Sequence, residues 1–437
     1  MVNRLVFTGL LFSSIFIFNS CQTDDRTGPF IDVKPNILLI IADDMGIEAC
    51  PGYTEGAVKP NMPNLQKLID NGIRFDNFWT YPICSPTRAS ILTGRYGYRT
   101  GVLDVDANGV IPTTEKTLHA YLDEQTGSAY SHSIIGKWHL SPKEPNRPTQ
   151  MGVGYYAGLL GGAVSDYNSW SLTENGQTST STEYVTTKFT NLAIDWINDQ
   201  DKPWFCWLAY TAPHTPFHLP PDSMHSQGSL PTDQASIDAN PQPYFMAMME
   251  SLDFEIGRLL KSIPENEIEN TVIIFIGDNG THGQVIQAPF VSTQAKGSLY
   301  EGGIHTPLVI SGFGVTRNKE REAALIGSTD LFATIADLCV GSIYKYEDSY
   351  SFTGLLSNGS GSQRQYNYSE VNNDIANKAG YAIRNKTHKL IQFDSGNRRL
   401  YNLEKDPYET ENLINKLTAD DQAALDELIA EAAKIRQ

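Results

Sequence analysis

Short apolar runs recur between residues 36 and 310 of the chain. Residues 36–42 read NILLIIA, an uninterrupted apolar run that is typical of a strand buried on both faces of a parallel sheet. We expect further strands at the similar runs 133–135, 204–208, 272–276 and 308–310.

Helical periodicity fills the segments between these runs. Apolar residues repeat there at the three- and four-residue spacing of one helix face. The repeating sets are Leu65, Leu68 and Ile69; Val185, Phe189, Leu192 and Trp196; and Met248, Met249, Leu252, Ile256 and Leu259. Strands that alternate with helices predict an α/β fold, in which a large mixed, mostly parallel sheet is flanked by helices on both sides.

The pattern changes near residue 345. Residues 381–384, 389–393 and 400–402 are typical of short antiparallel strands joined by turns. A final amphipathic helix begins at Thr418, which forms a plausible capping pair with Asp421. We therefore predict a large domain over 36–345 and a C-terminal α+β subdomain over 346–437, with a short antiparallel sheet and a terminal helix.

The N-terminus has the pattern of a targeting segment. Arg4 precedes an apolar run over 5–18 that is too short to span a membrane, and Cys21 follows. This arrangement resembles a bacterial lipoprotein signal over residues 1–21, cleaved before a lipidated Cys21 and followed by a polar linker over 22–35. We expect a secreted lipoprotein anchored by lipid in a membrane, at the cell surface or outer membrane, with the periplasm or ordinary signal cleavage as alternatives.

Charge and cysteine content exclude several classes of protein. The formal net charge of −17 argues against a nucleic-acid partner, because phosphate binding needs a basic surface. The spacing of the cysteines is neither a disulfide framework nor a zinc signature. They are Cys21, Cys50, Cys84, Cys206 and Cys339.

Polar residues follow the carboxyl ends of the predicted strands, where open α/β sheets bind ligands. Any one of these groups has a simpler explanation, since an acidic pair after a strand often caps the next helix. Together they would gather three carboxylates, an amide, a lysine and two histidines at one edge of the sheet. These residues are Asp43 and Asp44, Lys137 and His139, His214, and Asp278 and Asn279.

The ligand types at this edge indicate which metal would bind. Asp43, Asp44, Asp278 and Asn279 offer only oxygen atoms. Hard oxygen ligands suit Ca²⁺ or Mg²⁺ and argue against structural zinc. We expect Ca²⁺, because a crowded carboxylate cage supplies many oxygens at flexible distances, with Mg²⁺ as the alternative.

Cys84 stands at the start of a predicted helix that ends at Gly94. Backbone N–H groups at a helix N-terminus favour anions. Cys84 could simply be a buried cysteine before a capped helix. Against that interpretation, Cys84-x-Pro86-x-Arg88 is the recognition motif for conversion of cysteine to formylglycine.

These motifs together resemble the type I sulfatases of the alkaline-phosphatase superfamily, and the resemblance covers roughly residues 36 to 310. The matching segments, in family order, are Ala42-Asp43-Asp44, Cys84-Ser85-Pro86-Thr87-Arg88, Leu92-Thr93-Gly94-Arg95, Gly136-Lys137-Trp138-His139, Ala212-Pro213-His214, Gly277-Asp278-Asn279-Gly280, Lys296-Gly297 and Tyr300-Glu301-Gly302-Gly303. Two positions depart from the pattern: Thr87 stands where Ser is also common, and His305 where the family often has Arg.

The resemblance implies an alkaline-phosphatase-like fold and a mechanism. Hydrated formylglycine at position 84 would attack sulfur beside a metal held by residue 84, Asp43, Asp44, Asp278 and Asn279. Lys137 and Lys296 would bind the sulfate oxygens, and His214 or Lys296 would protonate or shield the leaving alcohol. His139 would take up the proton of the second hydroxyl, and Arg88 would orient residue 84. A formylglycine-generating or anaerobic sulfatase-maturing enzyme is the implied partner.

Alternatives remain for single residues and for the function. Arg88 could pair with a carboxylate of the cage, Lys296 could be a solvated surface lysine, and His282 follows Asn279 closely enough to line the pocket. The expected substrate is a sulfated carbohydrate, attacked at chain ends in the course of polysaccharide degradation. The competing functions are a phosphonate monoester hydrolase or phosphodiesterase of the same superfamily, and a catalytically silent glycan-binding surface protein.

Overall fold

The apolar run at residues 36–42 forms β1 (Asn36–Ala42), a central strand whose residues are all buried. The computed structural model describes residues 34–105, 109–372 and 378–437. β1 pairs in parallel with β8 (Trp204–Ala209) on one side and β9 (Thr271–Gly277) on the other. β4 (Ser131–Lys137) and β5 (Tyr155–Leu159) continue the parallel region beyond β8. Four of these five strands coincide with predicted apolar runs.

Antiparallel pairs extend the sheet on both sides of this parallel region. β10 (Leu308–Gly312) runs antiparallel to β9 and to β2 (Gly72–Phe75), and the edge strand β11 (Glu320–Glu322) pairs in parallel with β2. β6 (Trp170–Glu174) and β7 (Gln177–Ser181) extend the other edge. The order β11-β2-β10-β9-β1-β8-β4-β5-β6-β7 confirms the predicted large mixed, mostly parallel sheet. The run at 308–310 forms a strand, but an antiparallel one.

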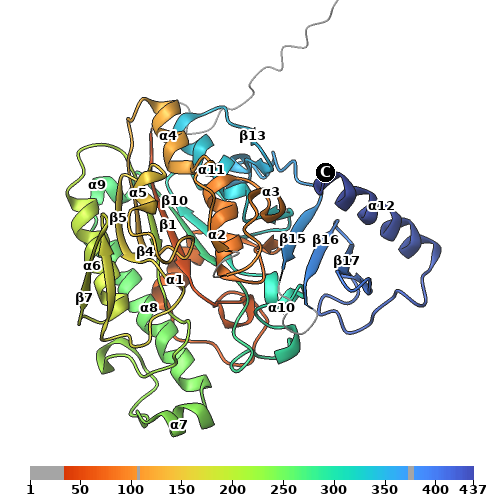
Figure 1. Cartoon of the computed structure of the whole chain (residues 1–437), viewed down its shortest axis with the longest axis horizontal. Helices are drawn as coiled ribbons and strands as arrows, with labels where there is room; N and C mark the ends of the chain where they lie inside the picture. The colour runs from red at the N-terminus through yellow and green to blue at the C-terminus, as the bar shows by residue number, and fades with distance from the viewer. Residues whose placement is uncertain (1–33, 106–108, 373–377) are drawn as a thin grey trace, which may run out of the picture.

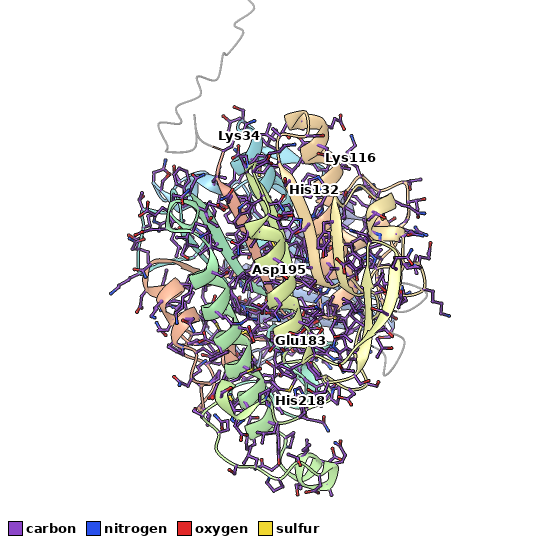
Figure 2. The ribbon with its side chains drawn as sticks, turned by 90° about the vertical axis from the view of Figure 1, so that its left-hand side faces the viewer. Lys34, Lys116, His132, Glu183, Asp195 and His218 are labelled. Atoms are coloured by element: carbon purple, nitrogen blue, oxygen red, sulfur yellow. The ribbon has the colours of Figure 1, made fainter. Side chains whose placement is uncertain are left out.

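Helices cover both faces of the sheet. Leu38, Ile40 and Ala42 of β1 enter one apolar core, and the alternate residues of the strand enter the other. The first core also contains α1 (Pro63–Asp70), α6 (Val185–Asn198) and α8 (Gln242–Ser262), and Figure 2 looks onto this layer, with Asp195 of α6 toward the viewer. The second contains α2 (Cys84–Thr93), α4 (Leu118–Thr126) and α11 (Asp330–Val340). Burial on both faces explains why β1 is apolar throughout.

The C-terminal part is a separate antiparallel sheet beside the large one (Figure 1). Its strands, paired in chain order, are β15 (Asn367–Val371), β16 (Gly380–Arg384), β17 (His388–Phe393) and β18 (Arg398–Asn402). α12 (Ala419–Ile435) packs on this sheet and begins with the predicted capping box of Thr418 and Asp421. The hairpin of β13 (Lys345–Tyr346) and β14 (Ser349–Tyr350) packs on α11. The domain boundary between residues 345 and 346 stays a prediction.

Shorter elements connect these layers. In residues 34–105, 109–372 and 378–437, no helix combines the length and apolarity needed to cross a membrane. Cys50, Cys84, Cys206 and Cys339 are buried free thiols. The predicted signal segment, with Cys21, and almost all of the linker lie outside the described residues. The short elements are β3 (Phe78–Trp79), β12 (Ile326–Gly327), α3 (Gly97–Thr100), α5 (Arg147–Gln150), α7 (Gln234–Ala239), α9 (Glu265–Ile268), α10 (Glu301–Ile304) and the 3₁₀ turns Ile47–Ala49, Asp222–Met224, Ser292–Gln294 and Thr353–Leu356.

Candidate active site

The carboxyl ends of the parallel strands meet as the sequence predicts. Backbone hydrogen bonds join the strand ends: the Asp43 amide donates to Ala212 O at 3.1 Å, and the Asp278 amide donates to Ala42 O at 3.1 Å. Figure 2 shows Lys34, just before β1, near one end of the molecule, and His218, in the segment after β8, toward the opposite end. The predicted polar residues therefore share one edge of the sheet.

The proposed metal ligands lie in one buried cluster. The Asp44 amide donates to Asp278 Oδ1 at 3.1 Å, and Asn279 Nδ2 donates to Asp44 Oδ1 at 2.7 Å. Cys84 Sγ lies 3.5 Å from Asp43 Oδ1. The four oxygen-bearing residues are at most 1% exposed. The structure thus brings together the five residues that the sequence predicted as ligands.

The donor atoms of this cluster fit a divalent cation. Asn279 Oδ1 is buried without a hydrogen-bond partner, although the amide nitrogen of the same side chain is bonded to Asp44 and Gly280. Burial, and then the charge of Asp43, raise the pKa of Asp278, as expected for carboxylates crowded together out of water. A buried oxygen without a donor and a set of carboxylates suit Ca²⁺ or Mg²⁺.

Two buried basic side chains, Lys137 and Arg88, pair with the carboxylates. Lys137 Nζ lies 2.5 Å from Asp43 Oδ2 and 3.3 Å from Cys84 Sγ. Arg88 donates to Asp278 Oδ2 at 2.7 Å and to Lys137 O at 2.8 Å. Arg88 therefore does pair with a carboxylate of the proposed metal cage, as the alternative interpretation expected. The Arg88 guanidinium therefore joins α2, which begins at Cys84, to the ends of β4 and β9.

Lys296 closes the cluster from the loop that precedes α10. Its Nζ donates to Asp44 Oδ2 at 2.7 Å, and its side chain is 17% exposed. Burial by itself lowers the pKa of Lys296, but the charges of Asp44, Cys84 and Asp43 and the hydrogen bond to Asp44 together outweigh burial and raise the pKa above its ordinary value. Lys296 therefore stays charged at the mouth of the cluster, and its interpretation as a solvated surface lysine is wrong.

Two histidines flank the cluster. His214 Nε2 lies 3.9 Å from Asp44 Oδ2, while its Nδ1 lies 2.8 Å from Thr215 O. Burial lowers the pKa of His214 to about 4 against the opposing charge of Asp44. Burial, followed by the charges of Lys137 and Arg88, lowers the pKa of His139 well below its ordinary value. Both imidazoles are therefore neutral near pH 7.

Cys84 is not reactive as a thiol in this setting. It is 2% exposed, and burial raises its pKa to about 12, so the thiolate is scarce at neutral pH. No side chain caps the start of α2 at Ile83, which leaves the first amides of the helix available to an anion. Thr87 Oγ1 accepts from the Tyr81 amide at 2.9 Å, a bond that Ser could also make.

Sequence reasoning missed several residues that shape the site. Thr281 Oγ1 accepts from the Gly46 amide at 2.9 Å and so ties the Asp44 loop to the Asn279 loop. Tyr167 OH donates to His214 O at 2.6 Å. A Cβ at Gly162 would lie 2.3 Å from the His139 ring, so this position has no room for a side chain. Of the three, only Thr281 carried a sequence signal, because it directly follows the Gly277–Gly280 motif.

Two histidines near the motifs take different places. His305 Nδ1 lies 3.1 Å from Glu301 Oε2, so the residue that departs from the family pattern pairs with an acid of α10. His282 is partly buried, and its ring centre lies 6.0 Å from that of Phe217. Burial lowers the pKa of His282. The charge of Asp44 acts to raise this pKa, and the charge of Lys296 acts to lower it further. That His282 lines the pocket stays a prediction.

Comparisons with known proteins agree with the geometry. YdeN of Escherichia coli, named an uncharacterized sulfatase, is 28% identical over 371 residues, which cover 71% of this chain and 64% of YdeN. Arylsulfatase J of Mus musculus is 27% identical over 374 residues, covering 78% of this chain and 59% of that protein. This chain therefore spans about three fifths of these two relatives.

Solved structures show the same fold. Ps i-CgsB in complex with k-i-k-neocarrahexaose has a TM-score of 0.78 and 23% identity, over 92% of this chain and 93% of that chain. BT4656 in complex with its substrate D-glucosamine-2-N,6-O-disulfate has a TM-score of 0.73 and 20% identity, over 92% of this chain and 98% of that chain. At this identity the likeness concerns the fold alone.

Family models match nearly the whole described part of the chain. The model described as N-sulphoglucosamine sulphohydrolase, C-terminal, matches residues 294–435, which include the antiparallel sheet and α12. The sulfatase model matches residues 35–342, which hold all the predicted site residues, and this chain therefore belongs to the sulfatase family.

Proposed function

We propose that this protein is a sulfuric ester hydrolase that removes sulfate from a sulfated carbohydrate, through formylglycine made from Cys84 and a divalent metal ion, with Ca²⁺ as the expected ion. The observation that carries the proposal is the position of Cys84 at the start of α2, 3.3 Å from Lys137 Nζ and 3.5 Å from Asp43 Oδ1. Membership of the sulfatase family supports it. N-acetylgalactosamine-6-sulfatase of Homo sapiens, 28% identical over 338 residues, supports a sugar substrate.

Position 84 supplies the nucleophile in this proposal. Cys84 Sγ stands where formylglycine would carry its oxygen. The hydrated aldehyde would offer a hydroxyl oxygen as the nucleophile toward sulfur, which a protonated thiol does not. Because Cys84 is 2% exposed, we expect a formylglycine-generating or anaerobic maturing enzyme to act before folding is complete.

The surrounding side chains have distinct tasks. A cation bound by Asp43, Asp44, Asp278 and Asn279 would supply Lewis acidity, and Lys137 and Lys296 would bind the sulfate oxygens. Arg88 orients the first turn of α2 and the Asp278 carboxylate through its bond of 2.7 Å.

Proton transfer falls to the two histidines and Lys296. His139 is neutral, and its buried Nδ1 has no hydrogen-bond partner, so this imidazole can accept a proton from residue 84. His214 and Lys296 both approach Asp44, and we assign them to the leaving alcohol.

Mass spectrometry and turnover together test the proposal. In protein from its native host, the peptide spanning Cys84 should carry an aldehyde in place of the thiol, and Cys84→Ala should lose sulfate release from an aryl sulfate. Active protein with only unmodified thiol would contradict the mechanism. Faster turnover of an aryl phosphonate than of an aryl sulfate would favour the phosphonate hydrolase, and binding of glycan without turnover would favour the silent glycan-binding protein.

Substrate access is a further part of this proposal. Lys296 and His214 are 17% and 15% exposed beside buried acids, and a restricted opening of this kind favours terminal sulfated sugars. Sulfate release from a sulfated glycan should therefore rise after depolymerisation, and equal release would contradict exo action.

The location of the protein is a separate proposal, a lipoprotein anchored through Cys21. Cys21→Ala should release soluble protein or block maturation, and a wild type without incorporated fatty acid would indicate ordinary secretion.

A further inference from the structure

A second group of buried charges lies where the C-terminal sheet meets the loops of the large sheet. Lys389 of β17 is fully buried, and its Nζ donates to Glu301 Oε1 at 2.9 Å. The same Nζ forms an ion pair with Glu409 Oε1 at 2.8 Å and lies 4.8 Å from the centre of the Trp79 ring. Glu301 and Glu409 are 3% and 4% exposed. We name Glu301, Lys389 and Glu409 the Lys389 cluster.

In the Lys389 cluster one lysine is shared by two acids, so the charge states of the three residues depend on one another. Burial raises the pKa of Glu409 to about 7, and Lys389 opposes this. At Glu301 burial also raises the pKa, but the charge of Lys389, the hydrogen bond and charge of His305 and the charge of Arg384 together outweigh burial and lower the pKa. Buried ion pairs stabilise little compared with apolar packing, whereas loss of one partner leaves an uncompensated charge. The contribution of such a cluster is therefore greater to geometry than to net stability.

The Lys389 cluster holds the start of α10. The Glu301 amide donates to Glu409 Oε2 at 2.6 Å, so the first residue of α10 is bonded through both its backbone and its carboxylate to the C-terminal part. α10 is in turn bonded to two segments of the active site. Gly280 N donates to Gly303 O at 2.9 Å, and Thr80 N donates to Ile304 O at 2.9 Å.

Close packing makes this connection rigid. A Cβ at Gly280 would lie 2.0 Å from Gly302 O, so the loop that carries Asn279 lies directly against the α10 backbone. The Lys296 amide donates to Thr281 O at 3.1 Å, and the Gly297 amide donates to Pro82 O at 2.8 Å. A shift of α10 would therefore move the loops of Asn279 and Lys296 and the segment that leads to Cys84.

We propose that Glu301, Lys389 and Glu409 are positioning residues for the catalytic centre, which they reach through α10. The C-terminal part then sets the geometry of the metal ligand Asn279 and of Lys296 without itself contributing a residue to the site. The inference rests on the proposed function for the identity of that centre. Side chains that support metal ligands from outside typically affect metal affinity or activity by about 10–100-fold.

The test compares two ways of disturbing the cluster with one matched control. Lys389→Met removes the central charge at similar length, and Glu409→Gln keeps the size of a side chain that bonds the Glu301 amide. Arg364→Met is the control, because Arg364 is 7% exposed and pairs with Asp330 and Tyr96 rather than with α10. Each variant is measured as full-length, formylglycine-bearing protein for Ca²⁺ affinity by calorimetry, for kcat and KM on an aryl sulfate, and for Tm.

We expect Lys389→Met and Glu409→Gln to lower Ca²⁺ affinity and kcat by about 10–100-fold at temperatures well below their Tm, with little change in KM. Arg364→Met should lower Tm and keep both quantities within about twofold of the wild type, the scatter of sites that do not couple. A Lys389→Met protein that loses Tm but keeps its Ca²⁺ affinity and kcat would show that the cluster is only structural. If Lys389→Met fails to fold, Glu409→Gln decides.

Hydrogen exchange separates this inference from the proposed function. The amides of Gly280 and Gly297 are bonded to Gly303 O and Pro82 O, so their peptides should exchange faster in Lys389→Met than in Arg364→Met. A wild type that hydrolyses no sulfate ester would refute the function, while the exchange rates would still decide the positioning. Unchanged exchange in these two peptides would overturn the inference even in an active enzyme.

Discussion

The catalytic cluster and the Lys389 cluster both set buried carboxylates against lysine, and they differ in whether oxygen atoms are left without a donor and in their access to solvent. In the catalytic cluster, the acids Asp43, Asp44 and Asp278 crowd around Asn279, whose Oδ1 has no donor. In the Lys389 cluster, one fully buried lysine forms ion pairs with two glutamates. Convergent oxygen atoms and a partly exposed Lys296 suit the first cluster to the binding that we propose, whereas the second is buried and joins two parts of the fold.

The largest expected effect breaks the catalytic cluster at Asp278. Asp278→Ala removes the partner of Arg88 and the acceptor of the Asp44 amide. We expect kcat on an aryl sulfate to fall by at least about 100-fold, the usual cost of removing a preorganised electrostatic group. The control is Asp253→Asn, which alters a buried acid that accepts from the amides of Asn64 and Leu65 at the start of α1. Full activity of Asp278→Ala would exclude Asp278 from the cage.

Metal removal tests the same cluster without mutation. EDTA should abolish sulfate release from the wild type, and Ca²⁺ should restore it better than Mg²⁺, because the crowded carboxylates do not impose the strict octahedron of Mg²⁺. Ca²⁺ should also raise Tm, since a ligand that binds only the folded state stabilises it. Activity that survives exhaustive chelation, or is restored by Zn²⁺ alone, would contradict an oxygen-ligand site.

A smaller effect concerns pH. The pKa of His139 is lowered, so its neutral form is present above the folded pKa and is lost only as the pH falls through that value. An ordinary histidine, with a pKa of about 6.5, would be mostly protonated at pH 6. We therefore expect kcat of Glu409→Gln, in which residue 409 cannot titrate, to change by less than about twofold between pH 7 and 6, in a profile measured with saturating Ca²⁺. A decline with a midpoint near pH 6.5 would show that burial does not control His139.

The smallest effect separates the C-terminal helix from the Lys389 cluster. Thr418→Ala removes the side-chain acceptor for the Asp421 amide at the start of α12 and should lower the free energy of unfolding by about 1 kcal/mol. It should leave kcat unchanged, because α12 packs on the outer core of the C-terminal sheet. A loss of activity in Thr418→Ala would mean that any disturbance of the C-terminal part reaches the site. The Lys389 cluster would then have no specific role in positioning the catalytic centre.

The central strands were predictable, and the edges were not. β1, β4, β8 and β9 carry apolar runs because both faces of the sheet are covered by helices. β7 reads QTSTS with four of its five residues exposed, and β11 reads ERE, so neither has an apolar signal to detect. The direction of β10 was also invisible, since an apolar run is the same in parallel and antiparallel pairing.

The sequence by itself determined the family and the place of the candidate site residues at the strand ends, because apolar runs and short motifs are local properties of the chain. Only the tertiary structure decided that Glu301, Lys389 and Glu409 are buried together. Lys389 and Glu301 are separated by 88 residues, and no sequence pattern predicts that they meet. Their ion pair exists because the C-terminal sheet packs against α10 and excludes water. Long-range burial of this kind depends on the packing of whole elements and leaves no local pattern in the chain.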